Sequence, residues 1–278
     1  MHDTVSEGRA SLEAARYVDG KGFVMAGMLE GKVGLVTGAG SGIGRSTAVA
    51  MAREGCKVVV SDIDEDGAAE TISMIEDAGG EASFAKADVS DPAQVEAAVK
   101  VAVDTYGALH LAVNNAGIGG EAGTVADYSV DGWRKVVSIN LDGVFYSMKY
   151  EIAAMLEAGG GSIVNIASIL GLVAWAQAPA YVAAKHGVVG LTKAGAIEYA
   201  QQGIRINSVN PGFIDTPLLR TAGIEPGSDL WDFIAGKHAM GRLGTPEEVA
   251  EAIVWVLSDA AGFVTGITLP VDGGFTAQ

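Results

Sequence analysis

The sequence has a single cysteine, few basic side chains and no long apolar run. Its 278 residues include 18 Lys and Arg against 34 Asp and Glu, which gives a formal net charge of −16 at pH 7. Binding to nucleic acids or to anionic membrane surfaces requires clustered Lys and Arg, and no such cluster occurs. The composition therefore argues against a nucleic acid or a membrane as a partner. Halophily or plain solubility would explain the acidity equally well.

The lone Cys56 cannot form an internal disulfide, which fits a reducing compartment. It begins the apolar run "CKVVV", so we expect a buried structural thiol rather than a reactive one. No apolar stretch approaches the roughly 18 residues of a membrane helix. The N-terminus also has no basic region followed by an apolar core, as a secretory signal would. We therefore expect a cytoplasmic protein.

From Lys32 onward, short apolar runs alternate with longer Ala-rich stretches. The runs that read as strands are "KVGLVTG", "KVVVSD", "LHLAVNN", "GSIVNIAS", "IRINSVNPG" and "ITLPVDGG". They are continuously apolar, as in a parallel sheet that is covered on both faces. The stretches that read as helices are 43–54, 65–78, 92–106, 132–157, 179–201 and 246–258. This alternation predicts a single-domain α/β protein, a doubly wound Rossmann fold with about seven parallel strands and helices on both faces.

Residues 1–30 differ from the rest and are interpreted as an N-terminal extension to a domain that covers 31–278. A short helix is conceivable at 11–17, before Gly-rich breaks. Two interpretations of this segment are equally open. One is a packed arm or subunit contact, and the other is incidental ordering.

The first strand runs into "TGAGSGIG", residues 37–44, and then into a helix. A Gly-rich turn at this place lets backbone N–H groups and the helix dipole face a pyrophosphate, and a Cβ would block the close approach. The spacing departs from G-x-G-x-x-G. Gly38 and Gly40 match the first two glycines of this motif, but Ile43 occupies its sixth position, where the third glycine would stand. A purely structural turn is the alternative interpretation.

The second strand ends on Asp62, whose carboxylate could accept hydrogen bonds from both hydroxyls of an adenosine ribose. The same carboxylate would repel a 2′-phosphate, and no Arg or Lys stands beside it in the sequence. These features predict NAD rather than NADP as the cofactor. Arg45 is the nearest rival for a phosphate, and we expect it to face solvent or a neighbouring subunit.

With "TGAGSGIG", "NNAG" at 114–117 and Tyr181-x-x-x-Lys185 in this order, the chain resembles the classical short-chain dehydrogenases/reductases over about residues 32–275. The resemblance implies NAD(H)-dependent hydride transfer between nicotinamide and a secondary alcohol or ketone. It also implies a catalytic set of four residues, namely Asn140, Ser168, Tyr181 and Lys185.

The chemistry agrees with these residue types. A free Tyr has a pKa of about 10, and a Lys ammonium one helical turn away, at i+4, would stabilise the phenolate of Tyr181. Tyr181 would then act as general acid/base, while Ser168 hydrogen-bonds the substrate oxygen. Lys185 would also hold the nicotinamide ribose. In the family's pattern Asn140, which falls within a long predicted helix, anchors a water that links Lys185 to solvent.

The resemblance implies further cofactor contacts from the Gly-rich turn and from the ends of the later strands. The full predicted set is Gly38, Gly40, Ser41, Gly42, Ile43, Gly44, Asp62, Ile63, Asp88, Val89, Asn115, Ala116, Gly117, Tyr181, Lys185, Pro211, Gly212, Ile214 and Thr216. Asn114 is expected to brace neighbouring strands instead of binding a ligand.

The substrate pocket is expected to be formed by the segment after Ser168, the residues that follow Gly117 and the stretch from Leu218 to Met240. It should be mainly apolar, with "TAGIEPGSD" at 221–229 as a mobile lid. Its candidate lining residues are Ile169, Leu170, Trp175, Phe213, Leu218, Trp231 and Phe233. An apolar wall without Arg argues against carboxylate or phosphorylated substrates and favours small or medium secondary alcohols, alicyclic ones included, and their ketones. No metal site is expected, because His186 and His238 have no partners at metal-ligand spacing.

The resemblance implies a homotetramer that assembles through the helices at 132–157 and 179–201. Two other functions are compatible with the same motifs. One is a lyase or epimerase that retains bound NAD without net redox change. The other is a non-catalytic dinucleotide sensor, against which the intact set of four residues argues.

Overall fold

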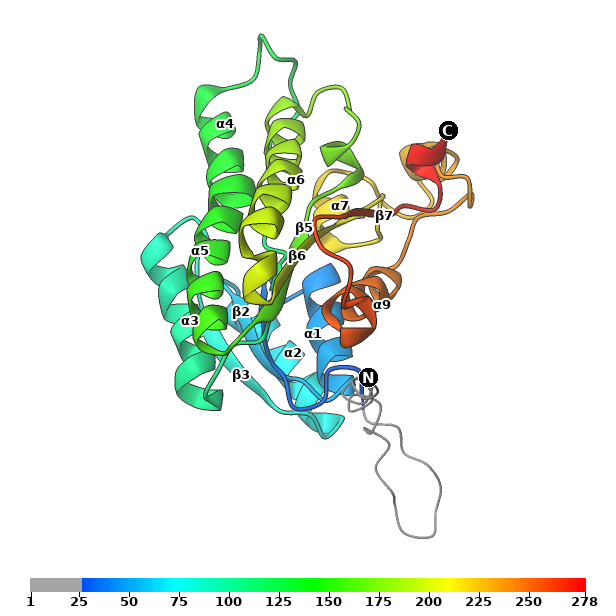
Figure 1. Ribbon diagram of the computed structural model, residues 1–278. Coiled ribbons are helices and arrows are strands. Elements are labelled where there is room, and N and C mark those ends of the chain that lie inside the picture. Colours follow the sequence, from blue (N-terminus) through cyan, green and yellow to red (C-terminus); the bar gives the residue numbers. More distant parts are fainter. Residues whose placement is uncertain (1–26) are drawn as a thin grey trace, which may run out of the picture.

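The fold is built on one sheet of seven parallel strands, which a computed structural model describes for residues 27–278 (Figure 1). The helix considered at 11–17 lies outside the described residues. The strands run in the order β3-β2-β1-β4-β5-β6-β7, and every neighbouring pair is parallel. Their bounds are β1 Val33–Thr37, β2 Lys57–Asp62, β3 Ala82–Lys86, β4 Leu111–Asn114, β5 Gly161–Ile166, β6 Ile204–Pro211 and β7 Thr268–Val271. The order reverses between β1 and β4, which in such sheets opens a crevice at the carboxyl ends of the strands.

Helices cover both faces of this sheet (Figure 1). One apolar core joins the strands to α1 (Gly42–Arg53), α2 (Glu65–Asp77) and α9 (Pro246–Leu257). A second core lies on the other face, against α3 (Pro92–Tyr106), α5 (Gly143–Glu157) and α6 (Pro179–Tyr199). Because both faces are buried, the strands are apolar throughout. The predicted doubly wound fold is confirmed.

Strand β3 is absent from the apolar runs that the sequence indicated. It is an edge strand, and only Ala85 of its five residues is fully buried. An edge strand needs less apolar surface, so its sequence "ASFAK" carries little signal. The predicted helix ends agree with the structure within two residues, which is the usual uncertainty at frayed ends.

The helix expected over 132–157 is present but is interrupted by a π-helical turn, so three segments occupy this stretch. Helix α4 (Val130–Val137) passes into a π-helical turn at Ser138–Asp142, and α5 follows. A π-turn inserts one extra residue into the helix, often at a functional site. Here the inserted turn contains Asn140.

Two short helices that the sequence did not indicate flank the proposed lid. They are α7 (Pro217–Thr221) and α8 (Asp229–Ala235). A small separate core of Ile224, Ile234 and Leu243 holds this region together. The lid therefore lies between two helices with apolar anchors of their own.

The last residues of the proposed extension that the structure describes pack against the domain. Leu29 is buried in the first core, and its N–H donates to Glu54 O at 3.0 Å. Cys56 is also buried, which raises the pKa of its thiol to about 12, as suits a structural residue. Within residues 27–278, no helix combines the length and apolarity needed to cross a membrane.

Candidate active site

A cavity of about 300 Å³ opens at the carboxyl ends of β1, β2 and β4. Twelve of the residues predicted to bind the cofactor line it, namely Gly38, Ser41, Gly42, Ile43, Asp62, Ile63, Asp88, Val89, Asn115, Ala116, Gly117 and Thr216. They come from five separate places along the chain, and the sheet topology brings them together. This is the crevice that the strand order predicts.

The Gly-rich turn presents the start of α1 to this cavity. Gly38 and Gly42 have φ angles of +63° and +52°, which favour glycine. Ser41 occupies the N-cap position without a side-chain cap, and the first turn of α1 carries no acidic residue. By contrast, Asp64 caps α2 and Thr245 caps α9. The amide dipoles at the start of α1 therefore remain available to an anion such as a pyrophosphate.

Gly40 and Gly44 belong to the predicted cofactor set, but they line neither this cavity nor the adjoining cavity that contains the predicted catalytic residues. A Cβ on Gly40 would lie 2.9 Å from Asp62 Oδ2, and one on Gly44 would lie 2.1 Å from Gly38 O. Both residues thus allow the turn to pack closely against β2 and against itself. Their role is to shape the turn.

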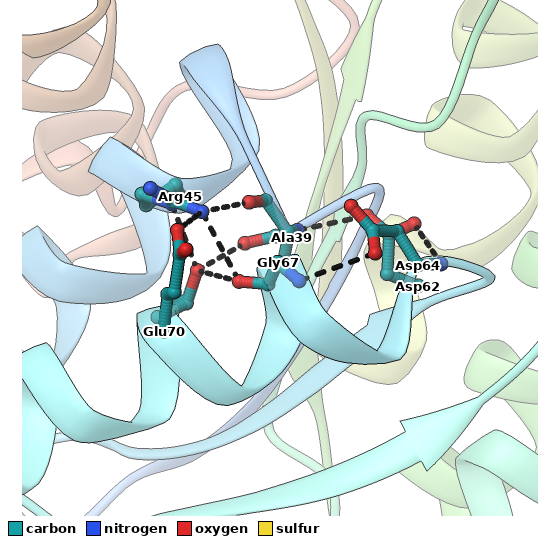
Figure 2. A network of polar contacts seen from close by, with 8 residues as sticks. Ala39, Arg45, Asp62, Asp64, Gly67 and Glu70 are labelled. Atoms are coloured by element: carbon teal, nitrogen blue, oxygen red, sulfur yellow. Dashed lines mark hydrogen bonds and ion pairs between the residues drawn. The ribbon is translucent and has the colours of Figure 1, made fainter.

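The carboxylate of Asp62 receives two backbone hydrogen bonds (Figure 2). Gly40 N donates to Oδ2 at 2.8 Å and Asp64 N donates to Oδ1 at 2.9 Å. A carboxylate has about four lone-pair positions, so each oxygen can accept one more bond, from a ribose hydroxyl for example. No Lys or Arg is among the described residues that line this cavity.

Arg45 does not simply face solvent, because its side chain is only 26% exposed and bonds within its own chain. Its expected contact with a neighbouring subunit stays a prediction. Its guanidinium donates to the carbonyls of Gly40 and Gly67 and pairs with Glu70 at 2.8 Å (Figure 2). Its Nε also donates to Thr71 Oγ1 at 3.1 Å. These acceptors come from the Gly-rich turn and α2, which meet only in the folded chain. Arg45 therefore ties the turn to α2, on the side away from Asp62.

A second cavity, of about 450 Å³, contains all four predicted catalytic residues, Asn140, Ser168, Tyr181 and Lys185. Its other predicted cofactor contacts are Ile43, Asn115, Gly117, Pro211, Gly212, Ile214 and Thr216. Four of these, Ile43, Asn115, Gly117 and Thr216, line the first cavity as well. The two cavities thus form one continuous site, with the four polar residues beyond the nucleotide end.

Asn140 is buried and its amide is fully engaged by the main chain. Its Nδ2 donates to the carbonyls of Ile118 and Val136, both at 3.0 Å, and its Oδ1 accepts from Ile118 N at 3.3 Å. A Cβ on Gly117 would lie 2.6 Å from this Oδ1 and 3.7 Å from Lys185 Nζ. Asn140 therefore fixes the loop after β4 beside Lys185. Its predicted water link stays a prediction.

Ser168 follows β5 and caps a 3-10 turn at Ile169–Gly171. Its Oγ accepts from Leu170 N at 3.1 Å, and its carbonyl accepts from Asn210 Nδ2 at 2.7 Å. The hydroxyl proton is not used in these contacts, so Ser168 can still donate into the cavity.

Tyr181 and Lys185 lie on α6, with Lys185 Nζ 5.5 Å from the centre of the Tyr181 ring. The ammonium donates to Ile166 O at 2.8 Å, and burial lowers its pKa to about 8. Burial also raises the pKa of Tyr181, and a hydrogen bond with Ser168 opposes this shift only in part. In the protein alone, desolvation of the phenolate therefore dominates. The lowering of the Tyr181 pKa expected beside Lys185 and oxidised nicotinamide stays a prediction.

The substrate end of the cavity is mainly apolar. Of the predicted wall, Ile169, Leu170, Trp175, Phe213 and Leu218 line it. Trp231 and Phe233 do not: Trp231 packs in the small core, and Phe233 is 53% exposed beneath Lys237. The other lining residues lie in the predicted stretches after Gly117 and from Leu218 to Met240 but were not named individually; they include Glu121, Leu219, Ala222, Ile224, Leu230 and Ile234. The helical period of α8 is the signal that could have found the last two, since residues four apart share a face.

Asn114 braces the strands, as expected. Its Nδ2 donates to Asn165 Oδ1 at 2.9 Å and to Glu151 Oε2 at 3.0 Å. Glu151, on α5, is completely buried, and burial raises its pKa to about 8. Nothing in the sequence pattern indicated this carboxyl, because its burial depends on helix packing. It belongs to the scaffold beneath the site.

Comparisons with known proteins agree with this site. Residues 38–276 match a family model described as enoyl-(acyl carrier protein) reductase. The chain is 52% identical to a cyclohexanol dehydrogenase of Acinetobacter sp. strain SE19, over 92% of this chain and 99% of the relative. It is 44% identical to a cis-4-hydroxycyclohexanecarboxylate dehydrogenase of Sinomonas cyclohexanicum, over 88% and 97%. The solved structure of a levodione reductase superposes with a TM-score of 0.87 at 37% identity, covering 90% of this chain and 99% of that one.

The fold and site define a nucleotide-binding oxidoreductase with a Tyr–Lys pair. The chain belongs to the short-chain dehydrogenase/reductase family. It is thus a dehydrogenase-type enzyme that transfers a hydride with a nicotinamide cofactor, as the sequence motifs predicted.

Proposed function

We propose that this protein is an NAD-dependent dehydrogenase that interconverts small alicyclic secondary alcohols and their ketones. The observation that carries the proposal is the second cavity, where four polar side chains meet an apolar wall next to the nucleotide end. The names of two relatives, a cyclohexanol dehydrogenase and a hydroxycyclohexanecarboxylate dehydrogenase, support a six-membered ring as substrate.

The charges around the cavity favour an uncharged substrate. Lys185 is the only Lys or Arg among the described lining residues, and its ammonium is held by Ile166 O. Glu121 also lines the cavity, and hydrogen bonds from Ser129 hold its pKa below the usual range, so it is ionised at neutral pH. A carboxylate or phosphate group on the substrate would be repelled by the Glu121 carboxylate. No cation other than Lys185 is among the described lining residues to balance its charge. Cyclohexanol is therefore a better candidate than its ring acids.

Asp62 supports the preference for NAD. Its carboxylate has further acceptor positions for ribose hydroxyls, and no Lys or Arg among the described residues lines its cavity to receive a 2′-phosphate. We propose that the predicted cofactor residues, apart from Gly40 and Gly44, contact NAD directly. Those two act by keeping the turn compact.

Tyr181 moves the proton on the substrate oxygen. Its raised pKa keeps the phenol protonated near neutral pH, the form that protonates a ketone oxygen during reduction. Ser168 donates its hydroxyl proton to the same oxygen when substrate is bound and stabilises the charge that develops there. Bound nicotinamide supplies the hydride and, when oxidised, a positive charge. For alcohol oxidation Lys185 adds its own charge beside Tyr181, which favours the phenolate.

We also propose a homotetramer that assembles through α4, α5 and α6. Phe145 and Ile197 support this, because these large apolar side chains are exposed on α5 and α6. Exposed apolar side chains of this size are common at subunit contacts. Light scattering on the purified protein tests the assembly. The domain boundary at residue 31 and the cytoplasmic location stay predictions.

A panel of substrates tests the proposed reaction. We expect cyclohexanol with NAD to increase absorbance at 340 nm, and cyclohexanone with NADH to decrease it, with NADP and NADPH much less effective. Straight-chain secondary alcohols should react more slowly, and cyclohexanecarboxylate derivatives more slowly still. Substrate conversion without net absorbance change would indicate a lyase or epimerase, and tight NAD binding without any turnover would indicate a sensor.

A further inference from the structure

The loop after β6 separates the substrate cavity from a smaller cavity of about 100 Å³. Gly212, Phe213 and Ile214 line both cavities. Atoms beside a void lack contacts on that side, so the small cavity leaves this wall room to move away from the substrate. The shape of the substrate cavity therefore depends on what holds Phe213 in place.

His238 holds the wall from behind. Its imidazole is 3% exposed; Phe213 N donates to Nε2 at 3.2 Å, and Nδ1 lies 2.9 Å from Ile234 O. A carbonyl can only accept and a backbone N–H can only donate, so Nδ1 carries the proton and Nε2 carries none. The ring thus connects Phe213 to Ile234 of α8, and both of these residues line the substrate cavity.

Aromatic contacts reinforce this connection. The Phe213 ring lies 5.5 Å from Trp175, 5.9 Å from His238 and 5.9 Å from Phe275, measured between ring centres. Phe275 also lies 5.3 Å from His238. The C-terminal turn that carries Phe275 is fixed by Asp272, which accepts from Gly274 N at 3.0 Å and from Thr276 N at 2.9 Å.

We propose that His238, supported by Phe275, is a positioning residue that selects alcohols by ring size, by fixing Phe213 at the substrate wall. This rests on the proposed function, because it requires the cavity to accept alicyclic alcohols. Without an acceptor at Nε2, the N–H of Phe213 has no partner, and the wall relaxes toward the small cavity. The substrate cavity widens, and six-membered rings lose their fit relative to larger rings.

Paired substitutions test this role. His238→Gln keeps an acceptor near the position of Nε2, whereas His238→Leu removes it. His110→Leu is the matched control, since His110 Nδ1 also accepts a backbone N–H, from Val33 at 3.1 Å, at the opposite end of the sheet. The measurements are kcat and KM for cyclohexanol and cyclooctanol, the Kd for NAD, and Tm.

We expect His238→Leu to lower the ratio of cyclohexanol to cyclooctanol kcat/KM about fivefold, the worth of one hydrogen bond. The change should lie mainly in KM, with the Kd for NAD unchanged. His238→Gln should restore the ratio to within about twofold of native. His110→Leu should lower Tm and leave the ratio as it is.

Equal losses for both rings, no restoration by Gln, or the same shift with His110→Leu would each overturn the positioning role. If His238→Leu does not fold, Phe275→Ala replaces it, and an unchanged ratio in that variant also overturns the proposal. Failure of the native enzyme to oxidise any alcohol with NAD would instead refute the proposed function. Native turnover with unaltered ring selectivity in the variants refutes only this inference.

Discussion

Replacing Glu151 with Gln tests the buried carboxyl beneath the site. Glu151 is completely buried beside Asn114, and burial raises its pKa from 4.5 to about 8. Its Oε1 and the Oδ1 of Asn114 have no partner among the described residues. A proton on Glu151 removes the buried charge and adds a donor to this cluster. The folded protein therefore keeps the carboxyl protonated at pH values where the unfolded chain ionises it.

The sign of the pH effect follows from this difference. Between about pH 4.5 and pH 8 the folded state binds a proton that the unfolded state has lost, so stability falls as pH rises. The slope is about 1.4 kcal/mol per pH unit, on the order of 4 kcal/mol between pH 5 and pH 8. Gln has nearly the same shape, accepts from Asn114 through its carbonyl and does not titrate. Glu151→Gln should therefore remove most of this slope and be more stable than native at pH 8.

Denaturant unfolding at pH 5, 6, 7 and 8 measures the free energy of unfolding for each protein. Glu157→Gln, an exposed substitution on the same helix, is the matched control and should follow the native pH dependence. If Glu151→Gln kept the native slope, Glu151 would be ionised in the fold, and the reasoning from burial would be refuted.

Three further substitutions address the site. Tyr181→Phe should lower kcat by a factor of about 100 to 10,000, the usual contribution of a general acid, while the Kd for NAD, measured by fluorescence titration, stays unchanged. An unchanged kcat would exclude Tyr181 as the proton donor. Asp62→Asn should raise kcat/KM with NADP relative to NAD about tenfold, because it removes a like charge near the 2′-phosphate; an unaltered ratio would show that Asp62 does not set the preference. Arg45→Met should lower the free energy of unfolding by about 1–3 kcal/mol, as loss of a charged hydrogen-bond donor does, and should weaken NAD binding. A native Tm would show that the Gly-rich turn keeps its place without Arg45.

Features that depend on periodicity or on an ordered set of motifs were predictable from the sequence. The central strands are buried on both faces, so runs such as "KVVVSD" marked them, and the Tyr181–Lys185 spacing placed both side chains on one helix. The edge strand β3 carried no such signal because it buries little. The π-turn at Asn140 also escaped detection, since one inserted residue leaves the helical composition unchanged.

Features that depend on tertiary partners were not predictable. Arg45 finds its acceptors on α2, some 20 residues further along the chain, and Glu151 is buried by strands that precede and follow it. The same limit applies to Trp231 and Phe233, which composition could not separate from Leu230 and Ile234 on the same short helix. In each case the residue type was informative, but its environment was decided by packing.

The four residues proposed as catalytic differ in how firmly the main chain holds them, and this difference agrees with their proposed roles. Asn140 is bound to Ile118 and Val136, Lys185 to Ile166 O, and the carbonyl of Ser168 to Asn210. The Tyr181 hydroxyl, in contrast, has only the Ser168 side chain as a partner within residues 27–278. A group that must give and take a proton needs free hydrogen-bonding capacity, whereas groups that orient it need fixed positions. The Tyr181 hydroxyl therefore stays free to follow the substrate oxygen, with the Ser168 hydroxyl beside it.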